Sequence, residues 1–278
     1  TTKPVAIYPT HNKKEKPFAM MAQNMRISSG GIKGNYYEII VGGKKGYVHK
    51  NAVEQDNGVP ILIYHHLVEN QENSIHKNNV SVYDIDLFTQ QADYLSTQKF
   101  YTLSLKDLDA WMKHQQALPA KAVILTFDDA TLSAYELVYP LLKKYRMFAT
   151  TFVIGDRVSD KTPAFDMNKN QFAGFNELRE MQGVFELEHH TYGLHTFNSI
   201  TKKSSLQYAS NNALHYDFTH MNDVFKKIDP TLEPSYLSYP YGKYLKSHEG
   251  TLIRNGISLA VLNKGGKTKI DSARLYVP

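Results

Sequence analysis

Two adjacent aspartates at the end of an apolar segment are the residues in this sequence best suited to chemistry. Ala122–Phe127 reads Ala-Val-Ile-Leu-Thr-Phe, a run typical of a buried strand, and Asp128 and Asp129 follow it directly. Strands of α/β enzymes often present reactive groups at their C-terminal ends. Adjacent carboxylates repel each other, so the pair indicates a bound cation or a shared proton. A solvated turn is the alternative, because Asp is common where a strand ends.

Two histidines five residues apart form a second candidate group, His190 and His195, with Gly193 between them. In a loop these rings can converge, whereas on a regular helix only spacings of three or four face together. Two imidazoles and one carboxylate are a common set of ligands for a catalytic divalent metal. The chain contains 12 histidines, so this pair gains weight only in combination with the aspartates.

Two further segments suit acid catalysis and anion binding. Residues 60–64 predict a strand, and His65 or His66 at its end can act as a general acid. Alternate strand residues face opposite ways, so only one of the two can point into a site. The turn Pro240–Gly242 can present a backbone N–H to an oxyanion, although an ordinary Pro-Gly turn fits the same residues.

The elements around these groups alternate between strand and helix from residue 57 onward. Residues 148–154 predict a buried strand, a capping box beginning at Ser104 predicts a helix, and residues 204–228 predict one long helix. Residues 274–277 read as a last strand. Such alternation indicates βα units around a largely parallel sheet or barrel.

Residues 1–56 have a different pattern of short alternating segments separated by glycine turns, which predicts a small, self-contained all-β domain. The segment from Gly34 to Ile39, followed by Gly46 to His49, resembles a bacterial SH3-like domain. Residues 55–58 form the expected linker. We therefore expect one small domain, residues 1–56, and one large domain, residues 57–278.

Composition narrows the functional classes. The chain has 278 residues, 42% of them hydrophobic, and contains no Cys, which excludes thiolate nucleophiles, disulfides and Cys-ligated zinc. The 19 Tyr and 13 Phe suit contacts with sugar rings. The net charge of +5 permits an anionic partner, but no nucleic-acid-binding motif accompanies it. The one dense basic run, residues 12–16, reads as a solvated loop.

Taken in order, these strand-end motifs resemble the NodB-homology polysaccharide deacetylases (carbohydrate esterase family 4) over residues 59–278. The leading Tyr64-His65 is similar to the circularly permuted branch, which includes the poly-N-acetylglucosamine deacetylases. The resemblance implies an α/β fold, a distorted (β/α)7-type barrel behind the SH3-like domain. It also implies a hydrolase that acts on amide bonds.

The resemblance carries roles to individual residues. Asp128 is implied as the general base, with His65 as the acid that protonates the leaving amine and His66 as its rival. The N–H of Tyr241 is implied to line the oxyanion hole. The ligands implied for one divalent metal ion, most simply zinc, are Asp129, His190 and His195.

The sequence also departs from the family pattern. Ala130 replaces the usual Gly after the Asp pair, and Ser238 replaces the Arg that normally orients the base. Arg274 is a candidate substitute for that Arg. No Trp follows Pro240, and the single Trp, Trp111, is expected to pack on a helix.

The sequence therefore predicts a metal-dependent de-N-acetylase of N-acetylglucosamine units in a bacterial cell-wall or surface polysaccharide. We expect it to be monomeric, and extracellular or associated with the surface of a Gram-positive-type bacterium. Because the chain begins at Thr1, we expect a leader or membrane anchor outside it. The alternatives are a non-catalytic glycan-binding protein on a deacetylase scaffold and a basic nucleic-acid binder. The identity of the glycan stays open.

Overall fold

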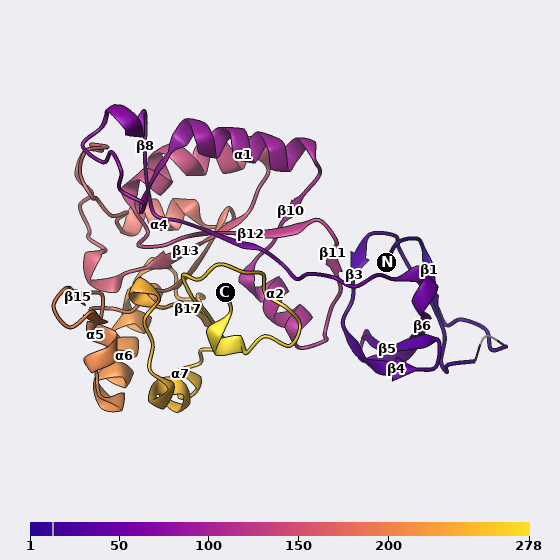
Figure 1. Cartoon of the computed structure of the whole chain (residues 1–278). Helices are drawn as coiled ribbons and strands as arrows, with labels where there is room; N and C mark the ends of the chain where they lie inside the picture. The colour runs from indigo at the N-terminus through magenta and orange to yellow at the C-terminus, as the bar shows by residue number, and fades with distance from the viewer. Residues whose placement is uncertain (13) are drawn as a thin grey trace.

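A single parallel sheet organises most of the chain (Figure 1). The computed structural model describes residues 1–12 and 14–278, without the side chain of Asn73. The basic run 12–16 includes Lys13, which lies outside the described residues. The seven strands of the sheet are β7 (Ile61–Tyr64), β10 (Tyr101–Thr102), β12 (Ala122–Phe127), β13 (Ala149–Val153), β14 (Phe185–His189), β17 (Tyr236–Ser238) and β18 (Leu259–Val261).

The strands follow the order β10-β12-β13-β14-β17-β18, and β7 pairs with the second half of β12. All of these pairings are parallel. Among the described residues no strand pairing joins β18 to β7, so the predicted barrel is present as a curled, open half-barrel.

Helices cover the outer face of this sheet. They are α1 (Ile85–Thr97), α3 (Tyr139–Tyr145), α4 (Phe175–Met181), α5 (Ser205–Tyr208), α6 (Asn211–Ile228) and α7 (Glu249–Arg254). The main core contains Phe88 of α1, Leu178 of α4 and Phe225 of α6, packed against Leu125 and Phe127 of β12. No helix in the described part of the chain has the length and apolar character needed to cross a bilayer.

The inner face of the sheet packs on α2 (Leu105–Met112). Ser104 caps this helix through the predicted capping box, and Trp111 is buried in the inner core with Ile124 and Phe152, as expected. Along β12, residues therefore alternate between the two faces, with Leu125 outward and Ile124 inward.

Residues 1–56 form a small β unit at one side of the sheet domain (Figure 1). Its strands are β1 (Val5–Ile7), β2 (Ala19–Met21), β3 (Met25–Arg26), β4 (Ser29–Lys33), β5 (Tyr36–Val41) and β6 (Lys44–His49). Strands β4, β5 and β6 form an antiparallel sheet, and β1 pairs with β2. Ile7, Ile39 and Val48 are buried in a core of the unit's own.

The expectation that this unit is self-contained is wrong in one respect. Strand β3 pairs with β11 (Leu118–Pro119) of the large domain, with Arg26 opposite Leu118. Arg26 is buried, donates to Ala120 O at 3.0 Å and forms an ion pair with Asp56. Residues 1–56 and the sheet region of the chain therefore share a strand pair and a buried cation.

Two other expectations are corrected. The predicted helix 204–228 is two helices, because Ser210 caps the start of α6 through Ala213 N and Ala209 is extended. Residues Arg274–Tyr276 form a 3-10 turn instead of a last strand. The remaining short strands are β8 (His66–Val68), which pairs with β9 (Val82–Asp84), and β15 (Phe197–Asn198), which pairs with β16 (Lys203–Ser204).

Candidate active site

The register of the sheet brings the predicted residues together on its inner face. Ile63 pairs with Thr126, so His65 follows β7 at the level where Asp128 follows β12. His189 pairs with Leu237, which sets His190 beside Ser238. Because side chains alternate along a strand, each of these residues points to the same side as Ile124.

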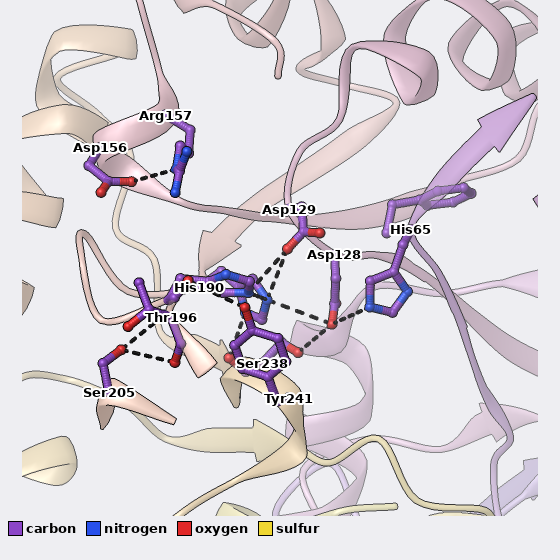
Figure 2. Close-up of polar contacts among 12 residues, drawn as sticks. His65, Asp128, Asp129, Asp156, Arg157, His190, Thr196, Ser205, Ser238 and Tyr241 are labelled. Carbon is purple, nitrogen blue, oxygen red and sulfur yellow. Dashed lines mark hydrogen bonds and ion pairs between the residues drawn. The ribbon is translucent and has the colours of Figure 1, made fainter. Parts of the chain in front are cut away.

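The turn after β12 separates the two adjacent carboxylates. Asp128 continues the inward direction of the strand, and the chain then enters the left-handed region at Asp129 and Ala130, with φ of 72° and 50°. Only glycine adopts that region without a steric penalty, which is of the order of 1–2 kcal/mol for other residues. Ala130 thus keeps a backbone geometry that favours Gly, and Asp129 enters the site from a different direction than Asp128 (Figure 2).

Asp129, His190 and His195 have the geometry of a metal site. One ligand atom from each lies within 4.8 Å of the others. Asp129 Oδ1 is 3.4 Å from His190 Nε2 and 3.3 Å from His195 Nε2, and the two imidazole nitrogens are 3.1 Å apart. Asp129 Oδ1 is also buried, and no described residue donates a hydrogen bond to it. Three converging lone-pair atoms of this kind fit a divalent cation.

The pKa shifts of Asp129 and His195 favour the protonation states that bind a metal, whereas the shift of His190 does not. His190 Nδ1 donates to Ser238 O at 2.8 Å, so its Nε2 lone pair faces the cluster. Burial, reinforced by the neighbouring His190, lowers the pKa of His195 to about 4. Burial opposes ionisation of Asp129, but contact with His190 and the nearby imidazoles outweighs it and holds the pKa at about 2. Burial would lower the pKa of His190, but the charges of Asp128 and Asp129 raise it.

Asp128 lies beside this cluster and has its own partners. Ser238 Oγ donates to Asp128 Oδ2 at 2.9 Å, and His65 Nε2 lies 3.7 Å from the same oxygen (Figure 2). His190 Nε2 is 3.9 Å away. Asp128 Oδ1 is buried and has no hydrogen-bond partner among the described residues. One oxygen is thus held by the protein, and the other is left for a substrate or water proton.

The structure separates the two candidate acids. His65 lines the cavity, whereas His66 is buried behind it. His66 Nε2 donates to Met167 O at 2.9 Å, and Ser133 Oγ lies 3.1 Å from Nδ1. His66 therefore fixes neighbouring chain segments and is not directed at Asp128.

Tyr241 reaches the cavity from the turn that follows β17. Its backbone is left-handed, with φ of 59°, and its ring centroid lies 4.9 Å from that of His195. Gly242 N donates to Tyr239 O and closes this turn. An oxyanion role for the Tyr241 N–H stays a prediction.

The cavity has a volume of about 460 Å³, within the usual range of ligand pockets. Besides the residues predicted from the sequence, its walls carry polar and aromatic side chains that the sequence did not single out: Ser81, Arg157, Asn170, Phe172 and Asn263.

Asp217 of α6 holds the histidine loop and was also missed as a functional residue. Its carboxylate accepts the N–H groups of Tyr192 and Gly193, both at 2.8 Å. Burial raises the pKa of Asp217, and the hydrogen bonds from the loop oppose that shift. Its position in the apolar stripe of the predicted helix, between Leu214 and Met221, was the available signal.

Arg274 does not replace the missing motif Arg. Its guanidinium lies 3.5 Å from Asp109 of α2, which is also paired with Lys113. The side chain bound to Asp128 is instead that of Ser238.

Comparisons with known proteins relate this chain to deacetylases. Residues 115–260 match the family model described as polysaccharide deacetylase. A poly-β-1,6-N-acetyl-D-glucosamine N-deacetylase of Staphylococcus aureus (strain MSSA476) is 30% identical over 185 residues, 64% of this chain and 57% of that protein. The chain thus spans somewhat more than half the length of this curated relative.

Solved structures of deacetylases share the fold of this chain. The structure of IcaB from Ammonifex degensii has a TM-score of 0.67 and 26% identity, covering 80% of this chain and 91% of that one. The Streptococcus pyogenes deacetylase PplD in complex with acetate has a TM-score of 0.63 and 24% identity, again covering 80% and 91%. The second likeness concerns the fold alone.

Proposed function

This chain belongs to the polysaccharide deacetylase family, and we propose that it is a metal-dependent N-deacetylase of N-acetylglucosamine units in a bacterial surface glycan. The observation that carries the proposal is the convergence of Asp129, His190 and His195 beside the partly unpartnered carboxylate of Asp128. The name of the Staphylococcus aureus relative supports poly-N-acetylglucosamine as the first substrate to test.

Asp129, His190 and His195 would hold the divalent cation, with zinc the simplest choice for a His₂-carboxylate set. When bound, such a cation polarises the acetamide carbonyl and lowers the pKa of a water molecule at the site. His190 contributes a fixed tautomer, because its Nδ1–H is bound to Ser238 O.

The proton transfers fall to Asp128 and His65. Asp128 Oδ1, which has no hydrogen-bond partner in the described part of the chain, would take the proton of the attacking water, while Ser238 Oγ donates to Oδ2. The oxygen of water bonds to the acetyl carbon, and the Tyr241 N–H would stabilise the resulting oxyanion. His65 would then donate a proton to the nitrogen as the C–N bond breaks, giving acetate and a free amine.

We propose that His65 acts from the N-terminal strand β7, as in the circularly permuted branch. Support comes from the pairing of β7 with β12 and the 3.7 Å separation of His65 Nε2 and Asp128 Oδ2. We further propose that residues 1–56 are an SH3-like module and that the protein works at the cell surface, where its glycan lies. The antiparallel sheet β4-β5-β6 and the separate core of this unit support the first point.

The direct test is release of acetate and free amine from β-1,6-linked and β-1,4-linked N-acetylglucosamine oligomers, with and without a chelator. We expect activity that chelation removes and added divalent metal restores. Asp128→Asn should bind metal but release no acetate. Oligomer binding by folded, metal-loaded wild-type protein without acetate release would favour the glycan-binding alternative.

A further inference from the structure

We infer that Tyr241 and Phe197 form a stacking surface for a second sugar of the glycan, next to the cavity that holds the reacting one. This inference rests on the proposed function and deepens it. It assigns a binding site to a second sugar of the same glycan chain, in addition to the sugar that reacts.

Three rings in contact lead outward from the metal site. The His195 and Tyr241 centroids are 4.9 Å apart, and those of Tyr241 and Phe197 are 5.1 Å apart. Tyr241 and Phe197 remain 45% and 39% exposed. Two large aromatic rings that contact each other yet stay half exposed beside a catalytic cavity provide an apolar surface ready for a partner.

Local backbone structure fixes the position of both rings. Phe197 lies in the β15–β16 hairpin, opposite Ser204. Ser205 N donates to Thr196 O at 2.8 Å, and Thr196 N donates to Ser205 Oγ at 3.0 Å (Figure 2). Tyr241 keeps a left-handed backbone that costs energy for a non-glycine residue, and such strain is concentrated at functional positions.

The occupant follows from continuity with the cavity. Tyr241 lines the cavity and also contacts Phe197, so a ligand that leaves the cavity along Tyr241 meets Phe197 next. In a polymer, that ligand is the neighbouring sugar of the same chain. Sugar rings present apolar faces that pack on aromatic rings, while their hydroxyls remain free for water or polar groups.

A rival occupant is a lipid surface, because Ile200 at the tip of the same hairpin is also exposed. A sugar occupant and a lipid occupant predict different binding behaviour. A sugar site should respond to oligomer length, whereas a lipid site should respond to vesicles and not to oligomers.

The test compares Phe197→Ala with a matched control, Tyr94→Ala, in the full metal-loaded chain. Tyr94 is also exposed and aromatic, but lies on the outer helix α1. Acetate release is measured on N-acetylglucosamine oligomers from dimer to pentamer. Phe197→Ala should raise the pentamer KM about 3- to 10-fold, the range for one lost aromatic contact, with kcat retained. Tyr94→Ala should match wild type, and Phe197→Trp should restore the KM.

A binding arm separates this inference from the proposed function. Pentamer affinity is measured by calorimetry in Asp128→Asn and in Asp128→Asn with Phe197→Ala, where no turnover is needed. The double variant should bind about 3- to 10-fold more weakly. The stacking surface would be overturned if wild type is active and the Phe197→Ala variants show the same dependence on oligomer length and the same pentamer affinity as their parent proteins. That result would leave the proposed function intact. Loss of vesicle binding without any change in oligomer affinity would assign the hairpin to lipid instead.

Discussion

Ser238→Ala is the variant that most directly tests how this site orients its base. Ser238 Oγ donates to Asp128 Oδ2 at 2.9 Å, and both side chains are buried. The substitution removes the hydroxyl and one hydrogen bond, but keeps the backbone carbonyl that accepts His190 Nδ1–H. The base should therefore lose its orientation while the metal ligands keep theirs.

The magnitude follows from the nature of this hydrogen bond. A bond to a charged group contributes about 1.5–3 kcal/mol, and about 1.36 kcal/mol corresponds to tenfold in rate. If the bond acts fully in the transition state, kcat should fall about 10- to 150-fold. Metal content should stay at the wild-type level, and KM for a short oligomer should change little, because Ser238 does not line the cavity.

The assay is steady-state acetate release, with metal content and denaturant unfolding measured on the same samples. Thr150→Val is the matched control, because Thr150 Oγ1 donates to Glu186 Oε2 at 3.1 Å and Thr150 is buried in the same sheet, away from the cavity. This variant also loses a buried hydroxyl-to-carboxylate bond, but should keep its kcat. A folded, metal-loaded Ser238→Ala protein with kcat within twofold of wild type would refute the role of Ser238.

Three further experiments address the other assignments. His190→Ala or His195→Ala should each strip the divalent metal from a folded chain, measured by atomic emission, and full retention in both would contradict the metal site. His65→Ala should lower kcat by roughly 10²–10⁴-fold. His66→Ala should mainly lower the free energy of unfolding, by about 1–3 kcal/mol, because it loses two buried contacts; an inactive but stable His66→Ala would reverse the two roles. Asp217→Asn should weaken metal affinity about 10- to 100-fold in chelator competition, since the two loop N–H groups bond different carboxylate oxygens and the amide replaces one of these with an NH₂ donor. Unchanged affinity would show that this contact does not set the loop.

The inward-facing residues of the strands were the most predictable part of the site. A buried strand ending in two carboxylates could be read directly, and the rule of alternating faces limited the pair His65 and His66 to one inward residue. The structure directs His65 to the cavity and buries His66. These features depend on the alternation of side chains along a strand, which can be read from neighbouring residues in the sequence.

Long-range partners could not be predicted in the same way. Ser238 and Asp128 are 110 residues apart and meet only through the pairing of several strands. Arg274 has the right charge to orient the base, yet Asp109 lies closer and pairs with it. The contact of β3 with β11 likewise joins two segments about 90 residues apart, one of them within the expected small domain and the other outside it.

The site therefore combines two kinds of structural control. Asp128 and His190 each follow directly after a strand, β12 or β14, so the register of the sheet sets their direction. Asp129 and His195 lie further along the loops that follow those strands. Asp129 depends on a left-handed turn, and His195 on a loop held by the carboxylate of one helical residue. Two of the three candidate metal ligands are thus positioned by loops, and we expect changes in those loops to alter metal affinity before they alter the fold.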